Sequence, residues 1–391
     1  MQSGLILLCL AYVLSQFFRA FLSVLSIPLG QDLGVTPQDL ADASGYWFLT
    51  FALMQIPVGR ALDRIGPRRT GGWLLLFGGG GGAALFALAQ SPGQIEAAMV
   101  LIGIGCSPVL MASYYIFARQ YPPARFATLA AVMLGVGSFG NLFAAWPTAV
   151  MAEAVGWRAT LWGLAGISVL VGLGILSTVK DPPPADTGEG GSLLTILKIP
   201  AIWALLPLMF FSYAPSAAIR GVWIGPYLDN VFGLTLGQIG TASLIMGAAM
   251  ILGTFTYGPL DRVLGTRKWV IFGGNLGALA ALVALVLWPQ AGIWQAVALM
   301  SLAGFFGASF PVLIAHGRAF FPAHLVGRGV TLLNLFGIGG VGVMNFVSGE
   351  AHALTPAAFT PAAPYATVFA LMAATLAFGL IVYLLAPDRT D

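Results

Sequence analysis

The sequence predicts an all-α membrane protein with twelve transmembrane helices arranged in two six-helix bundles. Of its 391 residues, 58% are hydrophobic and only 8% are charged, whereas soluble domains average roughly 25% charged residues. The mean hydropathy of +0.90 points to lipid as the solvent. A spanning helix takes about 20 apolar residues, so twelve spans leave no length for a soluble catalytic domain. The protein is therefore predicted not to be an enzyme.

Apolar runs of at least about 18 residues mark the predicted spans. They cover residues 5–28, 41–62, 71–90, 95–118, 127–150, 158–179, 200–224, 236–258, 269–289, 292–316, 329–349 and 364–386. The first run lacks a basic segment before it and contains Gln16 and Arg19, so we expect a true span rather than a signal peptide.

A polar, Pro/Gly-rich segment separates spans six and seven. It begins with Lys180-Asp181-Pro182-Pro183-Pro184, a composition that cannot stay helical in lipid. We therefore predict an N-terminal bundle over 1–179, a cytoplasmic linker over 180–199 and a C-terminal bundle over 200–391.

The basic residues set the orientation. With the N-terminus inside, fourteen of them lie on the cytoplasmic side and only Arg158 lies outside, which is the bias that positive-inside topology requires. Both termini are predicted cytoplasmic in a multi-pass protein, and the short loops favour a bacterial inner membrane. The fourteen are Arg60, Arg64, Arg68, Arg69, Arg119, Arg125, Lys180, Lys198, Arg262, Arg267, Lys268, Arg318, Arg328 and Arg389.

The two halves of the chain repeat each other. An offset of 199 residues aligns Gly34-Val35-Thr36 with Gly233-Leu234-Thr235 and Gly66 with Gly265. Equivalent residues at equivalent topological positions indicate two six-helix units in parallel orientation. Transporters with such a duplication place the substrate site between the two units.

The loop between spans two and three carries a motif. Its residues Gly59-Arg60-Ala61-Leu62-Asp63-Arg64-Ile65-Gly66-Pro67-Arg68-Arg69 resemble the G-x-x-x-D-R-x-G-x-R-R signature of the major facilitator superfamily. A weaker copy, Gly258 to Lys268, lies between spans eight and nine, with Asp261 three residues after its first glycine instead of four. The resemblance implies a secondary transporter of the superfamily fold.

The resemblance also implies that these two loops close the inner gate. The predicted gating residues are Gly59, Asp63, Arg64, Gly66, Arg68, Arg69, Gly258, Asp261, Arg262 and Arg267. The alternative is that the arginines only anchor the loops at the membrane surface.

Two arginines, Arg19 and Arg220, fall inside spans one and seven. A charge within the hydrocarbon costs about 2.5–3.5 kcal/mol on insertion scales, so it normally faces a cavity or a partner. In the superfamily these spans line the central cavity. Two guanidiniums that face one cavity make a clamp for carboxylate or phosphate oxygens, and this pattern resembles the organic-anion branches of the superfamily. The two residues differ by 201 positions, two more than the repeat offset of 199. On regular helices this excess would turn their side chains about 200° apart. An irregular backbone around Pro215 would restore the pairing, and snorkelling of Arg19 to the outer interface is the alternative.

The predicted function is the alternating-access transport of a small organic anion of the carboxylate, sulfonate or phosphate class. No carboxylate lies deep in a span, which disfavours a mid-membrane proton relay. The alternatives are a carrier for a cation, neutral solute, drug or metal ion, and a non-transporting membrane sensor. Coupling as symport or antiport stays open.

Polar and amphipathic residues within the spans complete the predicted binding site, although each is also suited to interhelical hydrogen bonding. They are Gln16, Tyr114, Tyr115, Asn141, Tyr213, Trp223, Asn334 and Asn345. No cofactor and no metal site is expected, because Cys9 and Cys106 lie in apolar stretches without a CxxC or His-rich tract. Membrane lipid is an expected partner, nucleic acid is not, and we expect a monomer.

Overall fold

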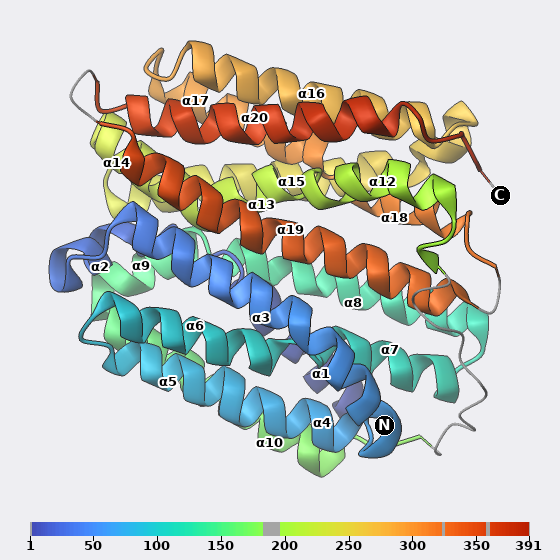
Figure 1. The fold of residues 1–391 in the computed structure, drawn as a ribbon. Helices are drawn as coiled ribbons and strands as arrows, with labels where there is room; N and C mark the ends of the chain where they lie inside the picture. Colours follow the sequence, from blue (N-terminus) through green and yellow to red (C-terminus); the bar gives the residue numbers. More distant parts are fainter. Residues whose placement is uncertain (1, 183–195, 323–324, 357–359, 391) are drawn as a thin grey trace. The chain divides into compact units, whose positions relative to one another are not determined.

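The computed structural model describes residues 2–182, 196–322, 325–356 and 360–390, in which helices are joined by turns and short loops and no strand occurs (Figure 1). The chain forms two compact units, Met1–Asp186 and Thr187–Asp391. The division falls within the predicted linker, of which residues 183–195 lie outside the described residues.

Unit 1 contains the first six predicted spans. Its helices are α1 (Gln2–Phe17), α2 (Ser26–Leu33), α3 (Pro37–Arg64), α4 (Pro67–Leu74), the π-helix η1 (Leu75–Gly80), α5 (Gly81–Leu88), α6 (Pro92–Cys106), α7 (Val109–Gln120), α8 (Pro123–Phe143), α9 (Trp146–Val155) and α10 (Trp157–Thr178). Within this unit α3 packs on α6, α1 packs on α8, and α10 packs on η1 and α5.

Unit 2 contains the last six predicted spans. Its helices are α12 (Pro200–Phe211), α13 (Ala214–Ala218), the π-helix η2 (Ile219–Trp223), α14 (Ile224–Phe232), α15 (Leu236–Leu264), α16 (Lys268–Leu287), α17 (Ile293–Gly307), α18 (Phe310–Arg318), α19 (Val326–Leu354) and α20 (Ala363–Tyr383). Here α15 packs on α17, and α20 packs on both α12 and α16.

Every predicted span coincides with a helix or with a helix that is broken within the span. In the described part of the chain, nine helices are long and apolar enough to cross a membrane, and ten if α8 and α9, bent by 43°, count as one span. The other two predicted spans correspond to α1, whose apolar part Gly4–Phe17 is short, and to the more polar α3. The multi-pass membrane protein predicted from the sequence is thereby confirmed.

The internal repeat extends to the local backbone. Gly34 ends α2 and Gly233 ends α14, and both adopt the left-handed conformation, with φ of 66° and 65°. Thr36 and Thr235 then begin α3 and α15, each with a reciprocal capping box. Such caps satisfy the backbone amides that a helix start leaves without partners, so the aligned residues define the same turn in both units.

The first span of each unit is irregular at its arginine. In unit 1, α1 ends at Phe17, and residues 18–25 form turns and a bend before α2 begins. In unit 2, a bend at Ser212 and Tyr213 is followed by α13 and the π-helical turn that contains Arg220. π-Helical turns within α-helices occur frequently at functional sites. The irregular backbone predicted around Pro215 is therefore present, and the first unit has a break of its own.

Candidate functional site

Arg19 lies in the break of unit 1, and its guanidinium rests on two aromatic rings of α3. Its Cζ is 5.2 Å from the ring centroid of Trp47 and 4.7 Å from that of Phe51. Both rings are buried and stacked on each other at 5.1 Å. The Arg19 Nε is also buried, has no hydrogen-bond partner among the described residues, and forms no ion pair with any described carboxylate.

The aromatic support of Arg19 was missed from the sequence. Trp47 and Phe51 are four residues apart, a spacing that places them on one face of a helix. This spacing was the available signal. A cation over such rings is stabilised by the ring quadrupole, by about 2 kcal/mol or more when the site is desolvated. The aromatic pair therefore holds a positive charge inside unit 1.

Gln16 belongs to a polar cluster formed by α1 and neighbouring helices. Its Nε2 donates to the Tyr12 hydroxyl at 2.9 Å, and the Tyr12 ring lies against Gly137 of α8, where a Cβ would come within 2.2 Å of it. The close packing of α8 on α1 depends on Gly140, where a Cβ would come within 2.1 Å of the Val13 carbonyl oxygen. The next residue, Asn141, has a buried Oδ1 without a hydrogen-bond partner among the described residues.

Tyr115 lies apart from that cluster, although it is adjacent to Tyr114 in the sequence. Its ring packs with Val58, Leu62 and Ala112, and the Arg119 guanidinium lies 3.8 Å from its centroid. Consecutive helical residues point about 100° apart. The structure therefore places Tyr115 against Arg119, which pairs with Asp63 at the end of α3, whereas Tyr114 packs on Phe126 of α8 at 5.8 Å between ring centroids.

Arg220 is 5% exposed and lies in the π-helical turn of unit 2. Its Nη1 is 3.6 Å from the Sδ of Met250 on α15, a side chain that is itself buried. A thioether is a weak acceptor, so this contact orients the guanidinium without bringing a negative charge to it.

Among the other predicted residues of unit 2, Trp223 and Asn345 are joined through Ser348, whose hydroxyl donates to the Asn345 carbonyl oxygen at 3.1 Å. Trp223 is fully buried and its indole donates to the Ser348 hydroxyl at 3.0 Å, so its single donor is occupied. Tyr213 packs on Phe310, with centroids 5.1 Å apart. On α19, Asn345 is fully buried and Asn334 is half-buried.

At the signature loop of unit 1, charged residues connect three helices. Asp63 forms an ion pair with Arg119 at 4.0 Å, whereas Arg64 and Arg69 are exposed. The carboxylate of Asp181, which follows α10, accepts from the Arg68 backbone amide at 2.7 Å. Gly66, with φ of 95°, leaves room for that carboxylate, because a Cβ there would lie 2.8 Å from it.

The copy of this loop in unit 2 has a different ion pair. Asp261 pairs with Arg267 of its own loop at 3.1 Å, whereas Asp63 pairs across to α7. The one-residue displacement of Asp261 in the motif rotates it by about 100° on the helix, which accounts for the change of partner. Asp388, after α20, accepts from the backbone amides of Arg267 and Lys268 at 3.2 and 3.0 Å. Gly258 lies in open space within α15, and Arg262 is exposed.

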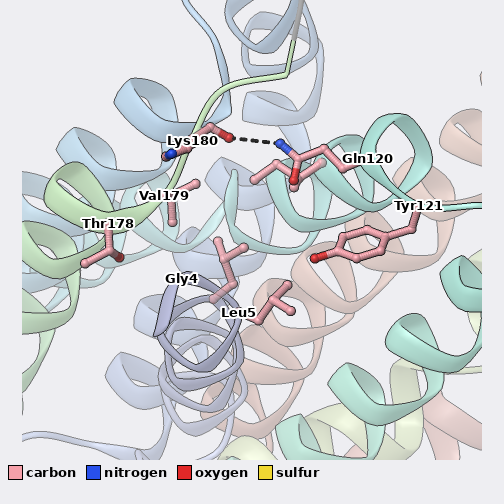
Figure 2. A pocket seen from close by; sticks show the side chains of 9 residues that line it. Gly4, Leu5, Gln120, Tyr121, Thr178, Val179 and Lys180 are labelled. Carbon is pink, nitrogen blue, oxygen red and sulfur yellow. Dashed lines mark hydrogen bonds between the residues drawn. The ribbon is translucent and has the colours of Figure 1, made fainter. Parts of the chain in front are cut away.

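A cavity of about 350 Å³ opens in unit 1, and none of the predicted binding residues lines it (Figure 2). It lies where α1 begins and where α7 and α10 end. Its lining residues are Gly4, Leu5, Leu8, Ile116, Gln120, Tyr121, Thr178, Val179 and Lys180.

The fold and these sites define a class of protein, a multi-pass membrane transporter built from two repeated helical units. Residues 8–219 match the family model of the Major Facilitator Superfamily, and the chain belongs to this superfamily. The superfamily identified from the signature loop is thereby confirmed. The chain is thus a member of a transporter superfamily and not an enzyme.

Three relatives show what this chain is similar to. The "Probable L-galactonate transporter" of Escherichia coli K12 is 21% identical over 352 residues, covering 83% of this chain and 73% of the relative. The "Probable sulfoacetate transporter SauU" of Cupriavidus necator is 22% identical and covers 76% and 75%. The "Transcription regulatory protein OpdE" of Pseudomonas aeruginosa is 27% identical and covers 77% and 74%.

Solved structures show the same fold. The crystal structure of a D-xylose–proton symporter matches with a TM-score of 0.79 at 15% identity, covering 98% of each chain. An inward-facing bacterial homologue of the lysosomal transporter Spinster matches with a TM-score of 0.77 at 18% identity, covering 98% of this chain and 94% of that one.

Proposed function

We propose that this transporter moves a small organic anion by alternating access, and that Arg19 and Arg220 bind the anion. The observation that carries the proposal is the environment of Arg19. Its guanidinium lies over Trp47 and Phe51 and forms no ion pair with any described carboxylate. Arg19 is partly buried, and a charge withdrawn from water normally requires a partner. A substrate carboxylate, sulfonate or phosphate would supply that partner each time it binds.

The names of the relatives support an anionic substrate. L-galactonate and sulfoacetate, for which two relatives are named, are both small organic anions. Arg220 provides the equivalent group in unit 2, since it also lies at an irregular turn of the first span. A guanidinium offers a rigid fork that matches two oxygens of such anions.

A thermal-unfolding titration tests the proposal. The purified protein is mixed with L-galactonate, sulfoacetate, other carboxylates and phosphates, and with neutral and cationic solutes. A ligand that binds the folded state raises the apparent Tm. We expect an anion to raise it in the wild type and in Arg125→Gln, an exposed arginine that serves as the matched control. We expect no response in Arg19→Gln or Arg220→Gln.

Two results would overturn the proposal. One is an anion response that persists unchanged in both arginine variants. The other is stabilisation by a cation or a neutral solute alone, which would favour the alternative carrier.

A membrane sensor is the second candidate, because one relative is named as a transcription regulatory protein. The two functions differ in whether solute crosses the membrane. Purified protein in liposomes is given the radiolabelled anion that raises the Tm. Uptake above that of empty liposomes supports transport, whereas binding without uptake supports the sensor.

We further propose that both termini are cytoplasmic in an inner membrane. Arg158 is the one basic residue predicted on the outer side, and it forms an ion pair with Asp32 at 2.9 Å. One such residue outside, against fourteen Lys and Arg predicted on the cytoplasmic side, leaves the orienting bias intact. Fusion of alkaline phosphatase to the C-terminus tests this topology, and an active phosphatase would contradict it.

A further inference from the structure

The cavity at the start of α1 has apolar walls and a polar rim. Leu5 and Leu8 of α1 and Ile116 of α7 form the walls, and Val179 closes one side. The volume of about 350 Å³ is at the lower end of the about 300–1,000 Å³ usual for small-ligand pockets. The lining residues all belong to unit 1, and none of the residues predicted to bind substrate is among them.

One hydrogen bond fixes the rim of this cavity. The Gln120 side-chain amide donates to the Lys180 carbonyl oxygen at 3.3 Å, joining the end of α7 to the segment after α10 (Figure 2). Tyr121, on the same side of the cavity as Gln120, projects toward Leu5 (Figure 2). Its hydroxyl forms no hydrogen bond within the described ranges of the chain. The hydrogen bond therefore holds the rim in place, and the Tyr121 hydroxyl is available to donate to a ligand.

Lys180 supplies the positive charge of the rim. It is exposed and forms no ion pair with a described carboxylate. The same end of α1 exposes Ile6 (60%) and Leu10 (43%), apolar surface that suits acyl chains and not water. A cation at the edge of an apolar slot, at the end of a membrane helix, complements a ligand with an anionic head and an apolar tail.

We propose that this cavity binds an anionic glycerophospholipid, with its phosphate on the Lys180 ammonium and an acyl chain against Leu5, Leu8 and Ile116. Basic pockets between membrane helices on the cytoplasmic side bind anionic head groups in this way. A soluble anion fits less well, because most of the lining is apolar and a soluble anion has no apolar group to contact it. The proposal does not depend on the identity of the transported substrate.

Thermal-unfolding titrations with lipid test the site. The purified full-length protein in neutral detergent is titrated with phosphatidylglycerol, with phosphatidylcholine, and with inorganic phosphate. We expect phosphatidylglycerol to raise the Tm and the other two to leave it unchanged. Lys180→Gln should weaken the apparent affinity for phosphatidylglycerol about fivefold, as expected for one lysine at a membrane surface.

Two further variants make the result specific. Lys180→Arg keeps the charge and should retain the wild-type response. Lys198→Gln removes another exposed lysine that does not line the cavity, and should also respond as the wild type. An equal response of Lys180→Gln and wild type would overturn the proposal. Stabilisation by phosphatidylcholine as strong as that by phosphatidylglycerol, or by inorganic phosphate alone, would overturn it as well.

Discussion

The carboxylate of Asp181 caps a helix that begins more than one hundred residues earlier, by accepting from the Arg68 backbone amide at 2.7 Å. The residue at the start of α4 is Gly66, which has no side chain to cap the helix itself. Asp388 does the same for α16, whose own N-cap residue, Arg267, forms no side-chain cap. In each unit, an aspartate a few residues after the last span thus caps the helix that follows the signature loop.

Removing this cap should destabilise unit 1. We expect Asp181→Ala to lower the free energy of unfolding by about 0.5–2 kcal/mol, the usual effect of losing an N-cap. Asp181→Asn should cost less, because its amide oxygen still accepts from the Arg68 amide although the charge at the helix start is lost. Thermal unfolding of the purified variants measures the difference. Equal Tm values for wild type and Asp181→Ala would contradict the capping role.

Asp388 predicts a pH dependence. Burial raises the pKa of its carboxyl, but hydrogen bonds from the Thr266 hydroxyl and from the Lys268 and Arg267 amides, together with nearby His316, hold it below the usual value. A lowered pKa means that the stabilisation is present above the unfolded-state pKa of about 3.9. It is lost as the pH falls through the folded-state pKa.

The measurement is Tm against pH for wild type and Asp388→Asn. The wild type should be more stable at neutral pH, and the difference should close in strong acid. A difference that is constant down to the lowest accessible pH would show that the Asp388 carboxylate charge is not responsible.

The sequence could predict much of this fold, because each step rests on local patterns. Run lengths and charge bias give spans and orientation, and the offset of 199 residues matched Gly34 to Gly233 and Thr36 to Thr235, which cap the same turns. The caps supplied by Asp181 and Asp388 were not predicted, because they join segments far apart in the sequence. The available signal was an aspartate shortly after the last span of each half.

The two aligned glycines of the signature loops should differ in tolerance. Gly66 has φ of 95° and ψ of 155°, a region essentially restricted to glycine, and its site faces the Asp181 carboxylate. Gly265 has φ of 65°, and no atom lies within 4 Å of the position that a Cβ would take there. We expect Gly66→Ala to cost about 1–3 kcal/mol in backbone strain and to displace Asp181 as well. Gly265→Ala should cost only about 1–2 kcal/mol.

Thermal unfolding of both alanine variants shows which substitution is the more destabilising. The single variants Gly66→Ala and Asp181→Gly and their double variant separate the two causes, since Asp181→Gly alone measures the lost cap and the double variant keeps the strain without the steric conflict. Gly265→Ala proving as destabilising as Gly66→Ala would contradict the role of Asp181 in this packing.

The candidate site was predicted less completely than the fold. Arg19 and Arg220 were found because a charge within an apolar run is conspicuous, but their surroundings depend on tertiary packing. Trp47 and Phe51 come from α3, and Met250 comes from α15. Tyr114 and Tyr115 show the same limit, because these adjacent residues of one helix pack on different neighbours, Phe126 and Arg119.

Replacing Arg19 with lysine tests the guanidinium itself, and rests on the proposed anion transport. Lysine keeps the charge but offers no planar fork to stack on Trp47 and Phe51 or to bind two oxygens at once. We expect Arg19→Lys to weaken the affinity for the transported anion by tenfold or more, on the order of 1.4 kcal/mol. Calorimetric titration with the anion identified by thermal unfolding measures the affinity. A wild-type Kd for Arg19→Lys would show that the planar guanidinium is not required for binding.

The ion pairs of the two signature loops should respond differently to neutralisation. Asp63 and Arg119 are 4.0 Å apart and their side chains are 46% and 26% exposed. Exposed pairs contribute about 0–1 kcal/mol. Asp261 and Arg267 are 3.1 Å apart and only 13% and 19% exposed. Removing one partner of a more buried pair leaves the other charge uncompensated, which costs more.

We therefore expect Asp261→Asn to lower the Tm further than Asp63→Asn does. The matched change at Arg267, to Gln, should lower the Tm less in the Asp261→Asn background than in the wild type, because the partner is already absent. Raising the salt concentration should reduce the effect of Asp63→Asn and leave most of that of Asp261→Asn, since partly buried pairs are screened less. Equal losses for the two aspartates at every salt concentration would mean that the one-residue shift in the second loop has no energetic consequence.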